Sequence, residues 1–253
     1  MISVWMELKG NPKIFRYMDL WKFEKMLANQ ALWCSSGIKI KEINDKLEGY
    51  YPLPIIQRGE EYKQKIIDEH KDWNLCIVNE GMSLAKHQQG ESKYIFINSW
   101  NVSDREQSLF WGSYINCEMG VVVVSDIISL QNSIILPECD MGGIFPIIYY
   151  DDNENVSGNM RFALNQFIFK RSNYASENEI RIILQKPKKG NICYGEKNEK
   201  GFDLPCDLHM LIKKIILDPS SRNKINKVIE LTEKYGLKNI DICKSELDKN
   251  PPY

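Results

Sequence analysis

The apolar residues of this chain fall into short runs rich in β-branched side chains, and these runs most constrain its fold. Val121–Val124 is an unbroken aliphatic run of strand length. Such a run is typical of a strand buried on both faces. Further strands are predicted over 14–17, 31–34, 94–100, 145–150, 177–184, 212–217 and 239–243. The chain therefore predicts sheets built from several short strands.

Helical patterns lie between these strands. Leu20, Phe23 and Leu27 recur at helical spacing after Asp19, a suitable N-cap. Other helices or helical turns are predicted over 59–71, 103–114, 161–170 and 222–235, the last capped by Ser220 or Ser221 and stopped by Gly236. Strands in mixed order with inserted helices indicate one α+β domain over 1–253, with curved, mainly antiparallel sheets and flanking helices. We expect 248–253 to form a loose tail.

Composition sets broad limits on function. The 253 residues include 33 basic and 34 acidic side chains, which argues against non-specific nucleic-acid binding by the whole surface. Seven cysteines without a Cys-x-x-Cys pair are typical of reduced thiols. The sequence begins without a signal-peptide pattern, and no apolar run approaches the length of a membrane span. We therefore expect a soluble, cytoplasmic protein without a membrane partner.

Several common catalytic motifs are missing from the sequence. The three histidines, His70, His87 and His209, do not pair with another His or Cys at ligand spacing. Neither a Gly-x-Ser-x-Gly elbow nor a phosphate-binding Gly-x-x-x-x-Gly-Lys loop occurs. We therefore expect no metal centre, no nucleophilic serine on such an elbow and no phosphate-binding loop of this kind.

The densest chemical signal is the stretch 176–184. Glu177, Glu179 and Arg181 alternate along it, so on a strand they would share one face. The commoner interpretation is a solvated strand face with cross-strand charge pairs. The functional interpretation is that one carboxylate stabilises a positive centre developing on a sugar while the other positions an acceptor. An arginine elsewhere, such as Arg16, would then grip a pyrophosphate through its planar fork.

The segment 110–114 is aromatic and also has two interpretations. Phe110, Trp111 and Tyr114 bury large areas in many cores. The same side chains also suit a stacking wall for a planar ring. The sequence leaves these two interpretations equally open.

Several motifs, in one order, resemble those of a widespread bacterial family known as domain of unknown function 2971. The matching segments are Phe15-Arg16-Tyr17, Leu32-Trp33-Cys34-Ser35, Asn44-Asp45-Lys46-Leu47-Glu48, Trp111-Gly112-Ser113-Tyr114, Gly120-Val121-Val122-Val123, Glu177-Asn178-Glu179-Ile180-Arg181 and Ile215-Ile216-Leu217-Asp218-Pro219. Lys46 stands where the family has a proline, and Ser113 where it has a histidine. The resemblance spans about 14–247 and implies a family without naming a reaction.

The order of the polar residues also resembles that of ADP-ribosyltransferases, which implies an ADP-ribosyltransferase-like fold. Those enzymes present an Arg or His on the first strand, a Ser or Tyr in the middle, and a Glu within Glu-x-Glu or Gln-x-Glu. The resemblance implies that Arg16 holds the phosphates of NAD and that Tyr114 stacks near the nicotinamide. It also implies that Glu179 binds the ribose hydroxyl and stabilises the oxocarbenium ion, while Glu177 orients the acceptor.

Three further residues join the expected NAD site: Tyr17, Trp111 and Ser113. The leading hypothesis is an enzyme that uses NAD as a substrate, without a metal, to modify a protein or nucleic acid. Such an activity suits a toxin or an anti-phage defence effector. The acceptor and the oligomeric state stay open.

Two alternatives stay open beside the transferase. One is a binding module for a nucleotide or nucleic acid, based on the basic side chains Lys170, Arg171, Arg181, Lys186, Lys188 and Lys189. The other is a magnesium-dependent nuclease, based on the carboxylates Asp45, Glu48, Glu177 and Glu179.

Overall fold

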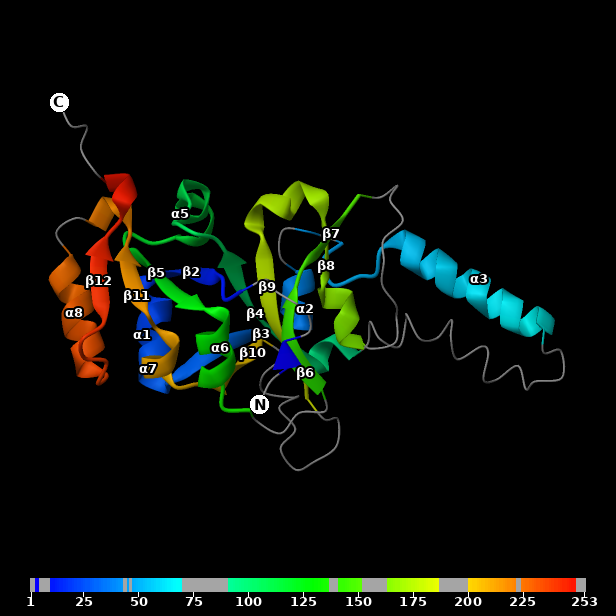
Figure 1. Ribbon diagram of the computed structural model, residues 1–253, viewed down its shortest axis with the longest axis horizontal. Coiled ribbons are helices and arrows are strands. Elements are labelled where there is room, and N and C mark those ends of the chain that lie inside the picture. The colour runs from blue at the N-terminus through cyan, green and yellow to red at the C-terminus, as the bar shows by residue number, and fades with distance from the viewer. Residues whose placement is uncertain are drawn as a thin grey trace. The chain divides into compact units, whose positions relative to one another are not determined.

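The chain forms two compact units in the computed structural model. The described residues are 3–4, 10–42, 45, 47–69, 91–136, 141–151, 163–186, 200–221 and 224–248. Unit 1 is drawn from 1–33, 98–137 and 203–253, and unit 2 from 34–97 and 138–202. Both units mix helices with mainly antiparallel strands, so the α+β class is confirmed (Figure 1).

The strands and helices of unit 1 are the following: β1 (Ser3–Val4), β2 (Lys13–Asp19), α1 (Leu20–Asn29), α5 (Ser108–Tyr114), β5 (Gly120–Asp126), α6 (Ile127–Ser133), α7 (Leu208–Leu211), β11 (Lys214–Leu217), η4 (Pro219–Ser221), α8 (Ile225–Lys234), β12 (Asp241–Lys244) and η5 (Glu246–Asp248). Those of unit 2 are α2 (Gly37–Lys41), α3 (Leu53–Glu69), η1 (Glu91–Tyr94), β6 (Met141–Pro146), β7 (Ile148–Tyr150), η2 (Ala163–Phe167), β8 (Phe169–Arg171), η3 (Ser172–Glu177) and β9 (Glu179–Gln185). The boundary between the units falls within β3 (Ala31–Ser36), β4 (Ile95–Val102) and β10 (Gly201–Pro205).

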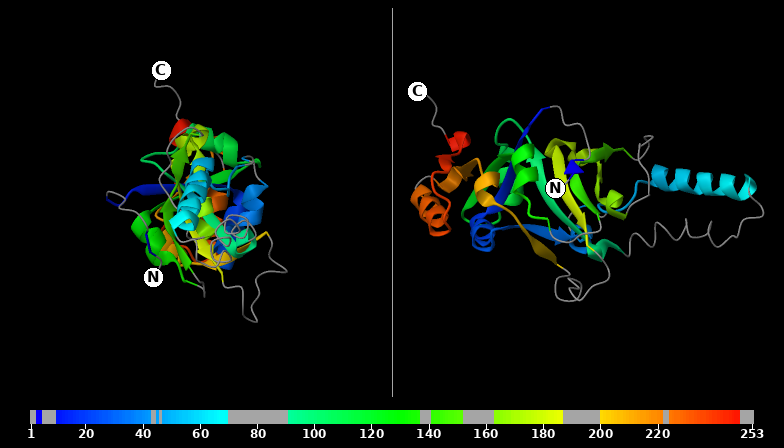
Figure 2. Two further views of the ribbon diagram at one scale, coloured as in Figure 1. Left: turned by 90° about the vertical axis from the view of Figure 1, so that its right-hand side faces the viewer. Right: turned by 60° about the horizontal axis from the view of Figure 1, so that its bottom comes forward.

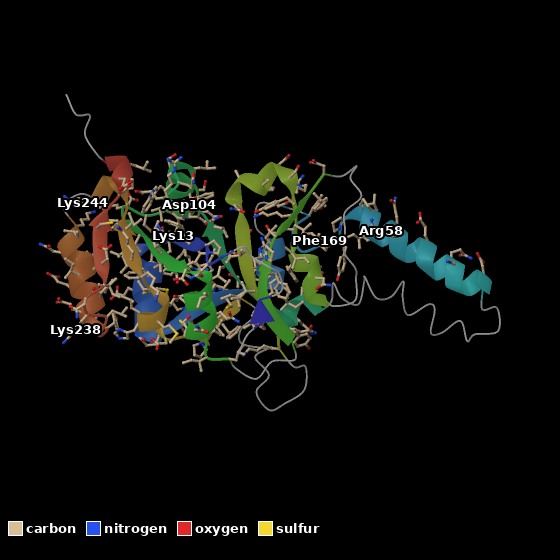
Figure 3. All side chains as sticks on the ribbon, viewed as in Figure 1. Lys13, Arg58, Asp104, Phe169, Lys238 and Lys244 are labelled. Atoms are coloured by element: carbon tan, nitrogen blue, oxygen red, sulfur yellow. The ribbon has the colours of Figure 1, made fainter. Side chains whose placement is uncertain are left out.

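The sheet of unit 1 follows from its β-branched runs. β5 pairs antiparallel with β2 on one side and with β11 on the other, so its valines are buried on both faces. β11 and β12 are parallel, which requires a crossover, and α8 supplies it. α8 packs beside β12 (Figure 1, Figure 2), while charged side chains such as Lys238 and Lys244 project outward (Figure 3).

The core of unit 1 is aromatic on one face of this sheet. Phe15 and Tyr17 of β2 lie opposite Val124 and Val122 of β5, so the four side chains share a face. The aromatic residues of α5 pack against them. This packing fixes α5 over β2.

Unit 2 has two small cores that meet along its short strands. β6 pairs antiparallel with β9, and β7 pairs in parallel with β8. Phe167 packs with Ile95, Phe145 and Ile183, whereas Phe169 packs with a second cluster around Tyr51 and Ile55.

Several sequence predictions need correction. The helical segment predicted over 161–170 is confirmed in part: η2 is a 3₁₀ helix over Ala163–Phe167, but the end of the range is wrong because β8 begins at Phe169. Phe167 ends η2 and packs in the first core, whereas Phe169 begins β8 and packs in the second, so the chain passes between the two cores where the 3₁₀ helix gives way to the strand. The strand predicted over 145–150 is divided, because β6 ends at Pro146 and β7 begins at Ile148.

The predicted helix caps also differ from those observed. α8 is preceded by Lys224 rather than by Ser220 or Ser221. Asp19 does precede α1, but its carboxylate makes no cap bond. It accepts a hydrogen bond from the backbone N–H of Asn116 at 2.7 Å and pairs with Lys22 at 2.8 Å. The predicted tail is outside the described residues from 249 onward.

Candidate functional site

Five charged side chains of unit 2 form a buried network. Glu179 and Arg181 come from β9, Lys170 from β8, Glu177 from the end of η3, and Glu48 from the segment before α3. All five are buried except Glu177, which is half-buried. Because burying a charge is costly unless it is paired, the geometry of these pairs determines what the site can do.

Arg181 is the centre of the network. It is 1% exposed. Its Nε and Nη2 donate to the two oxygens of Glu179 at 2.7 and 2.8 Å, and Nη1 donates to the carbonyl of Phe167 at 2.9 Å. Nη2 also donates to Glu48. Burial lowers the pKa of Arg181, but the carboxylates of Glu179 and Glu48 outweigh burial and hold that pKa above its ordinary value.

Lys170 connects Glu177, the remaining carboxylate, to the network. Its Nζ lies 2.6 Å from Glu177 Oε2, 3.3 Å from Glu179 Oε2 and 4.0 Å from Glu48 Oε2. Burial lowers the pKa of Lys170, yet Glu179 and Glu48 raise it above the ordinary value. The lysine therefore stays charged at neutral pH.

Three carboxylates thus face two cations, and Glu177 is the member closest to solvent. Its side chain is 18% exposed, against 9% for Glu48 and 4% for Glu179. Burial raises the pKa of Glu177, while Lys170 lowers it and the two other carboxylates raise it further. The net direction is upward, so Glu177 can hold a proton at a higher pH than an ordinary glutamate.

Two more contacts border the network. The backbone N–H of Glu179 donates to the hydroxyl oxygen of Tyr149 at 2.9 Å, and burial is the main reason that the pKa of this phenol rises to about 12. Arg171 donates two hydrogen bonds to the carboxylate of Asp45, from Nε at 3.3 Å and from Nη2 at 2.7 Å. Asp45 therefore already has a bidentate partner.

The solvated strand face expected for Glu177, Glu179 and Arg181 is wrong. Glu177 ends η3, and Asn178 takes a left-handed conformation with φ 41° before β9 begins. Asparagine tolerates this conformation better than most residues. The three side chains do meet, but Glu177 does so through Lys170 rather than by strand alternation.

The residues predicted to bind NAD lie in unit 1, and most of them are structural there. Tyr17 is buried, accepts a hydrogen bond from the backbone N–H of Gln107 at 2.7 Å, and contacts the rings of Phe110 and Trp111. Burial is the main cause that raises its pKa to about 12. Trp111 is also buried and donates from Nε1 to Glu106 at 2.9 Å. The core interpretation of the aromatic segment therefore describes Phe110 and Trp111.

Three predicted residues of unit 1 retain accessible atoms. Tyr114 is 37% exposed, and its ring stacks on Tyr17 with centroids 6.3 Å apart. Ser113 is exposed, and its hydroxyl donates to the carbonyl of Leu109 at 2.9 Å. Arg16 is half-buried, donates to the carbonyl of Ser99 at 2.7 Å, and lies 5.9 Å from the ring centroid of Trp100. The predicted site residues are thus divided between the units, and the convergence of Arg16 and Tyr114 with Glu179 stays a prediction.

Sequence reasoning missed two members of the network as partners of Glu179. Lys170 was counted in a basic run, and Glu48 among possible magnesium ligands. One signal was present: Lys170 directly follows the apolar Phe169 in a strand-length segment, and a lysine that becomes buried needs a carboxylate partner. The basic run itself is largely internal, since Lys170, Arg181 and Lys186 are buried. Lys188 and Lys189 lie outside the described residues.

Across the described residues, no group of three or more His, Cys, Asp or Glu side chains is placed to hold a metal ion. No helix in the described ranges is long and apolar enough to cross a membrane. Comparison with known proteins found no matching family model, no matching curated protein and no matching solved structure.

Proposed function

We propose that the chain is an ADP-ribosyltransferase-like enzyme that cleaves the glycosidic bond of NAD and transfers ADP-ribose to a macromolecule. The observation that supports this most is the position of Glu177. It is a partly exposed carboxylate with a raised pKa, held at 2.6 Å by Lys170 beside the fixed carboxylate of Glu179.

This arrangement suits chemistry at a sugar carbon. Breaking the bond to nicotinamide develops positive charge on the ribose, and a fixed negative field stabilises that charge. The network contains one more carboxylate than cations, and Arg181 holds Glu179 through both oxygens. The field is therefore oriented before the substrate binds.

Glu177 and Glu179 would have different roles. Glu179 is nearly buried and already bonded, so its contribution is electrostatic and includes placing Lys170. Glu177 is the carboxylate that a ligand can reach, and its raised pKa lets it accept the proton of an attacking group. We therefore assign to Glu177 the contact with the acceptor.

The test incubates the protein with cell lysate and NAD that is radiolabelled in its adenosine half. Two quantities are measured: the release of nicotinamide and the transfer of the label to a macromolecule. Glu177→Gln should lower the rate by about 10²-fold or more, which is the usual contribution of a positioned acid or base. The matched control is Glu61→Gln, an exposed carboxylate of the same unit, which should keep full activity. Absence of nicotinamide release by the unaltered protein, or equal rates in the two variants, would show the proposal to be wrong.

The two alternatives have less support from the network. Of the carboxylates of the proposed nuclease site, Glu48, Glu177 and Glu179 share Lys170, and Asp45 is paired with Arg171. A nucleic-acid surface based on the basic run would need solvated cations, and three members of that run are buried. Both alternatives would therefore require the ion pairs to rearrange.

A further inference from the structure

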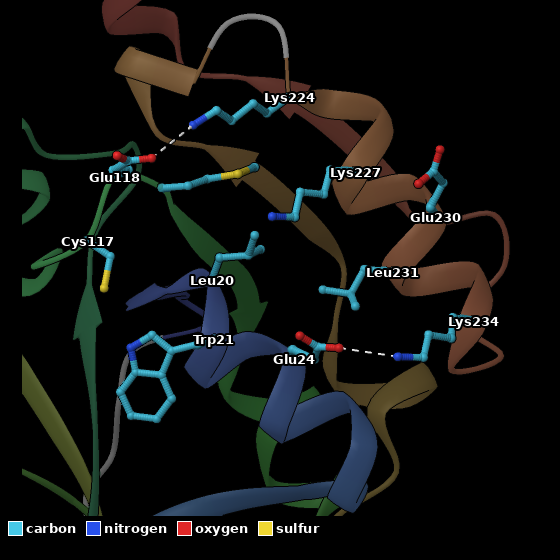
Figure 4. Close-up of a pocket in the computed structure, with 11 residues that line it drawn as sticks. Leu20, Trp21, Glu24, Cys117, Glu118, Lys224, Lys227, Glu230, Leu231 and Lys234 are labelled. Atoms are coloured by element: carbon cyan, nitrogen blue, oxygen red, sulfur yellow. Dashed lines mark hydrogen bonds and ion pairs between the residues drawn. The ribbon is translucent and has the colours of Figure 1, made fainter.

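A pocket of about 560 Å³ lies in unit 1 between α1 and α8 (Figure 4). Pockets for small molecules commonly measure about 300–1,000 Å³. Leu20, Met119 and Leu231 supply apolar side chains to it. None of its residues belongs to the charged network, so the pocket is a separate candidate site.

Trp21 offers a flat aromatic surface at this pocket. It lies in the first turn of α1 and is 57% exposed, although indole is among the side chains that gain most from burial. The ammonium of Lys22 lies 5.4 Å from the ring centroid. An accessible indole binds a planar ring by stacking.

The charges around the pocket leave one cation directed inward. Lys234 pairs with Glu24 at 3.3 Å, and Lys224 lies 3.9 Å from Glu118. Lys227 points its amine toward the apolar side chains, whereas the carboxylate of Glu230 is directed away from them (Figure 4). The inward ammonium of Lys227 therefore supplies a positive charge to the pocket, although the lining as a whole is balanced.

We propose that this pocket binds a nucleoside monophosphate, with the base stacked on Trp21 and the phosphate held by Lys227. The indole selects a planar ring, and the inward ammonium selects an anion attached to it. Leu20 and Leu231 accept the apolar edge of the ribose and base.

Calorimetric titration with AMP, GMP, CMP and UMP tests the proposal, with adenosine and ribose 5-phosphate as controls that each lack one feature. At least one of the four nucleotides should bind. Adenosine, which lacks the phosphate, and ribose 5-phosphate, which lacks the base, should each bind about tenfold more weakly than that nucleotide. Trp21→Leu and Lys227→Met should each weaken nucleotide binding by about tenfold, the effect of losing roughly one stacking or ionic contact.

Matched variants separate this site from general surface effects. Trp33→Leu and Lys238→Met alter an exposed indole and an exposed amine outside the pocket, so both should bind as the unaltered protein does. The altered pocket side chains are themselves exposed, and circular dichroism should show an unchanged fold. The proposal is wrong if none of the four nucleotides binds at millimolar concentration, or if Trp21→Leu and Lys227→Met bind as tightly as the two control variants.

Discussion

Replacing Arg181 with Met should strongly destabilise the protein. The side chain is 1% exposed and donates to Glu179 at 2.7 and 2.8 Å, to the carbonyl of Phe167 at 2.9 Å, and to Glu48. Its loss leaves three carboxylates beside a single lysine. Removing one partner of a buried ion pair costs about 3–5 kcal/mol, because the remaining charge stays desolvated.

Urea unfolding, followed by both circular dichroism and tryptophan fluorescence, measures this loss, and coincident curves would justify a two-state free energy. The control is Lys39→Met, which removes an ion pair to Glu42 in which both side chains are exposed, by 41% and 55%. The control should lose clearly less, since exposed pairs contribute little. A second variant, Arg181→Met with Glu179→Met, should recover part of the loss because it removes an uncompensated carboxylate as well. Equal losses for Arg181→Met and Lys39→Met would refute the reasoning.

Three further outcomes are expected. Glu177→Gln should raise the free energy of unfolding at neutral pH, because the folded protein raises the pKa of Glu177 and so disfavours its ionised form. Urea denaturation at several pH values measures this gain. The gain should shrink as the pH falls, because the natural carboxyl group then takes up its proton. Gly37→Ala should lower the free energy of unfolding in urea by about 1–3 kcal/mol, because the added Cβ would lie 2.4 Å from the Phe167 ring. Gly112→Ala is the control: Gly112 lies in α5 with open space around it, so this change should be neutral or stabilising by about 0.5–1 kcal/mol. Tyr17→Phe should cost about 1–3 kcal/mol in the same assay, because it leaves a backbone N–H without its acceptor.

The strands were the most predictable part of the fold. The run 121–124 became the interior of β5, and the segment 14–17 became β2 opposite it. Local composition largely decides such elements because β-branched side chains favour strands and the run is too short for a typical helix. The helical segment predicted over 161–170 ran too far, into β8, because the spacing of Phe162, Gln166 and Phe169 imitates one continuous helical face. Only tertiary packing shows that Phe167 and Phe169 enter two different cores.

The candidate site was predicted in part. The sequence identified Glu177, Glu179 and Arg181 as a group, and the structure brings them together. The sequence could not show whether the group faces solvent. Residues alternate along a strand in the same way whether the face is exposed or is covered by residues distant in sequence. Glu48 and Lys170 close this face, and neither is a neighbour of Glu179 in sequence. The aromatic segment carries a similar ambiguity, which only the burial of Trp111 and the exposure of Tyr114 resolve.

Burial also changes how the proposed activity has to be tested. Loss of Glu179 would remove two hydrogen bonds from Arg181 and one contact from Lys170, so inactivity of Glu179→Ala could result from unfolding alone. Glu177 contacts Lys170 at 2.6 Å, and its side chain is partly exposed, so its replacement should leave the fold intact. A variant that is at least as stable as the natural protein but does not turn over NAD would separate chemistry from structure. Glu177→Gln is therefore the informative substitution at this site, even though Glu179 lies closer to the centre of the network.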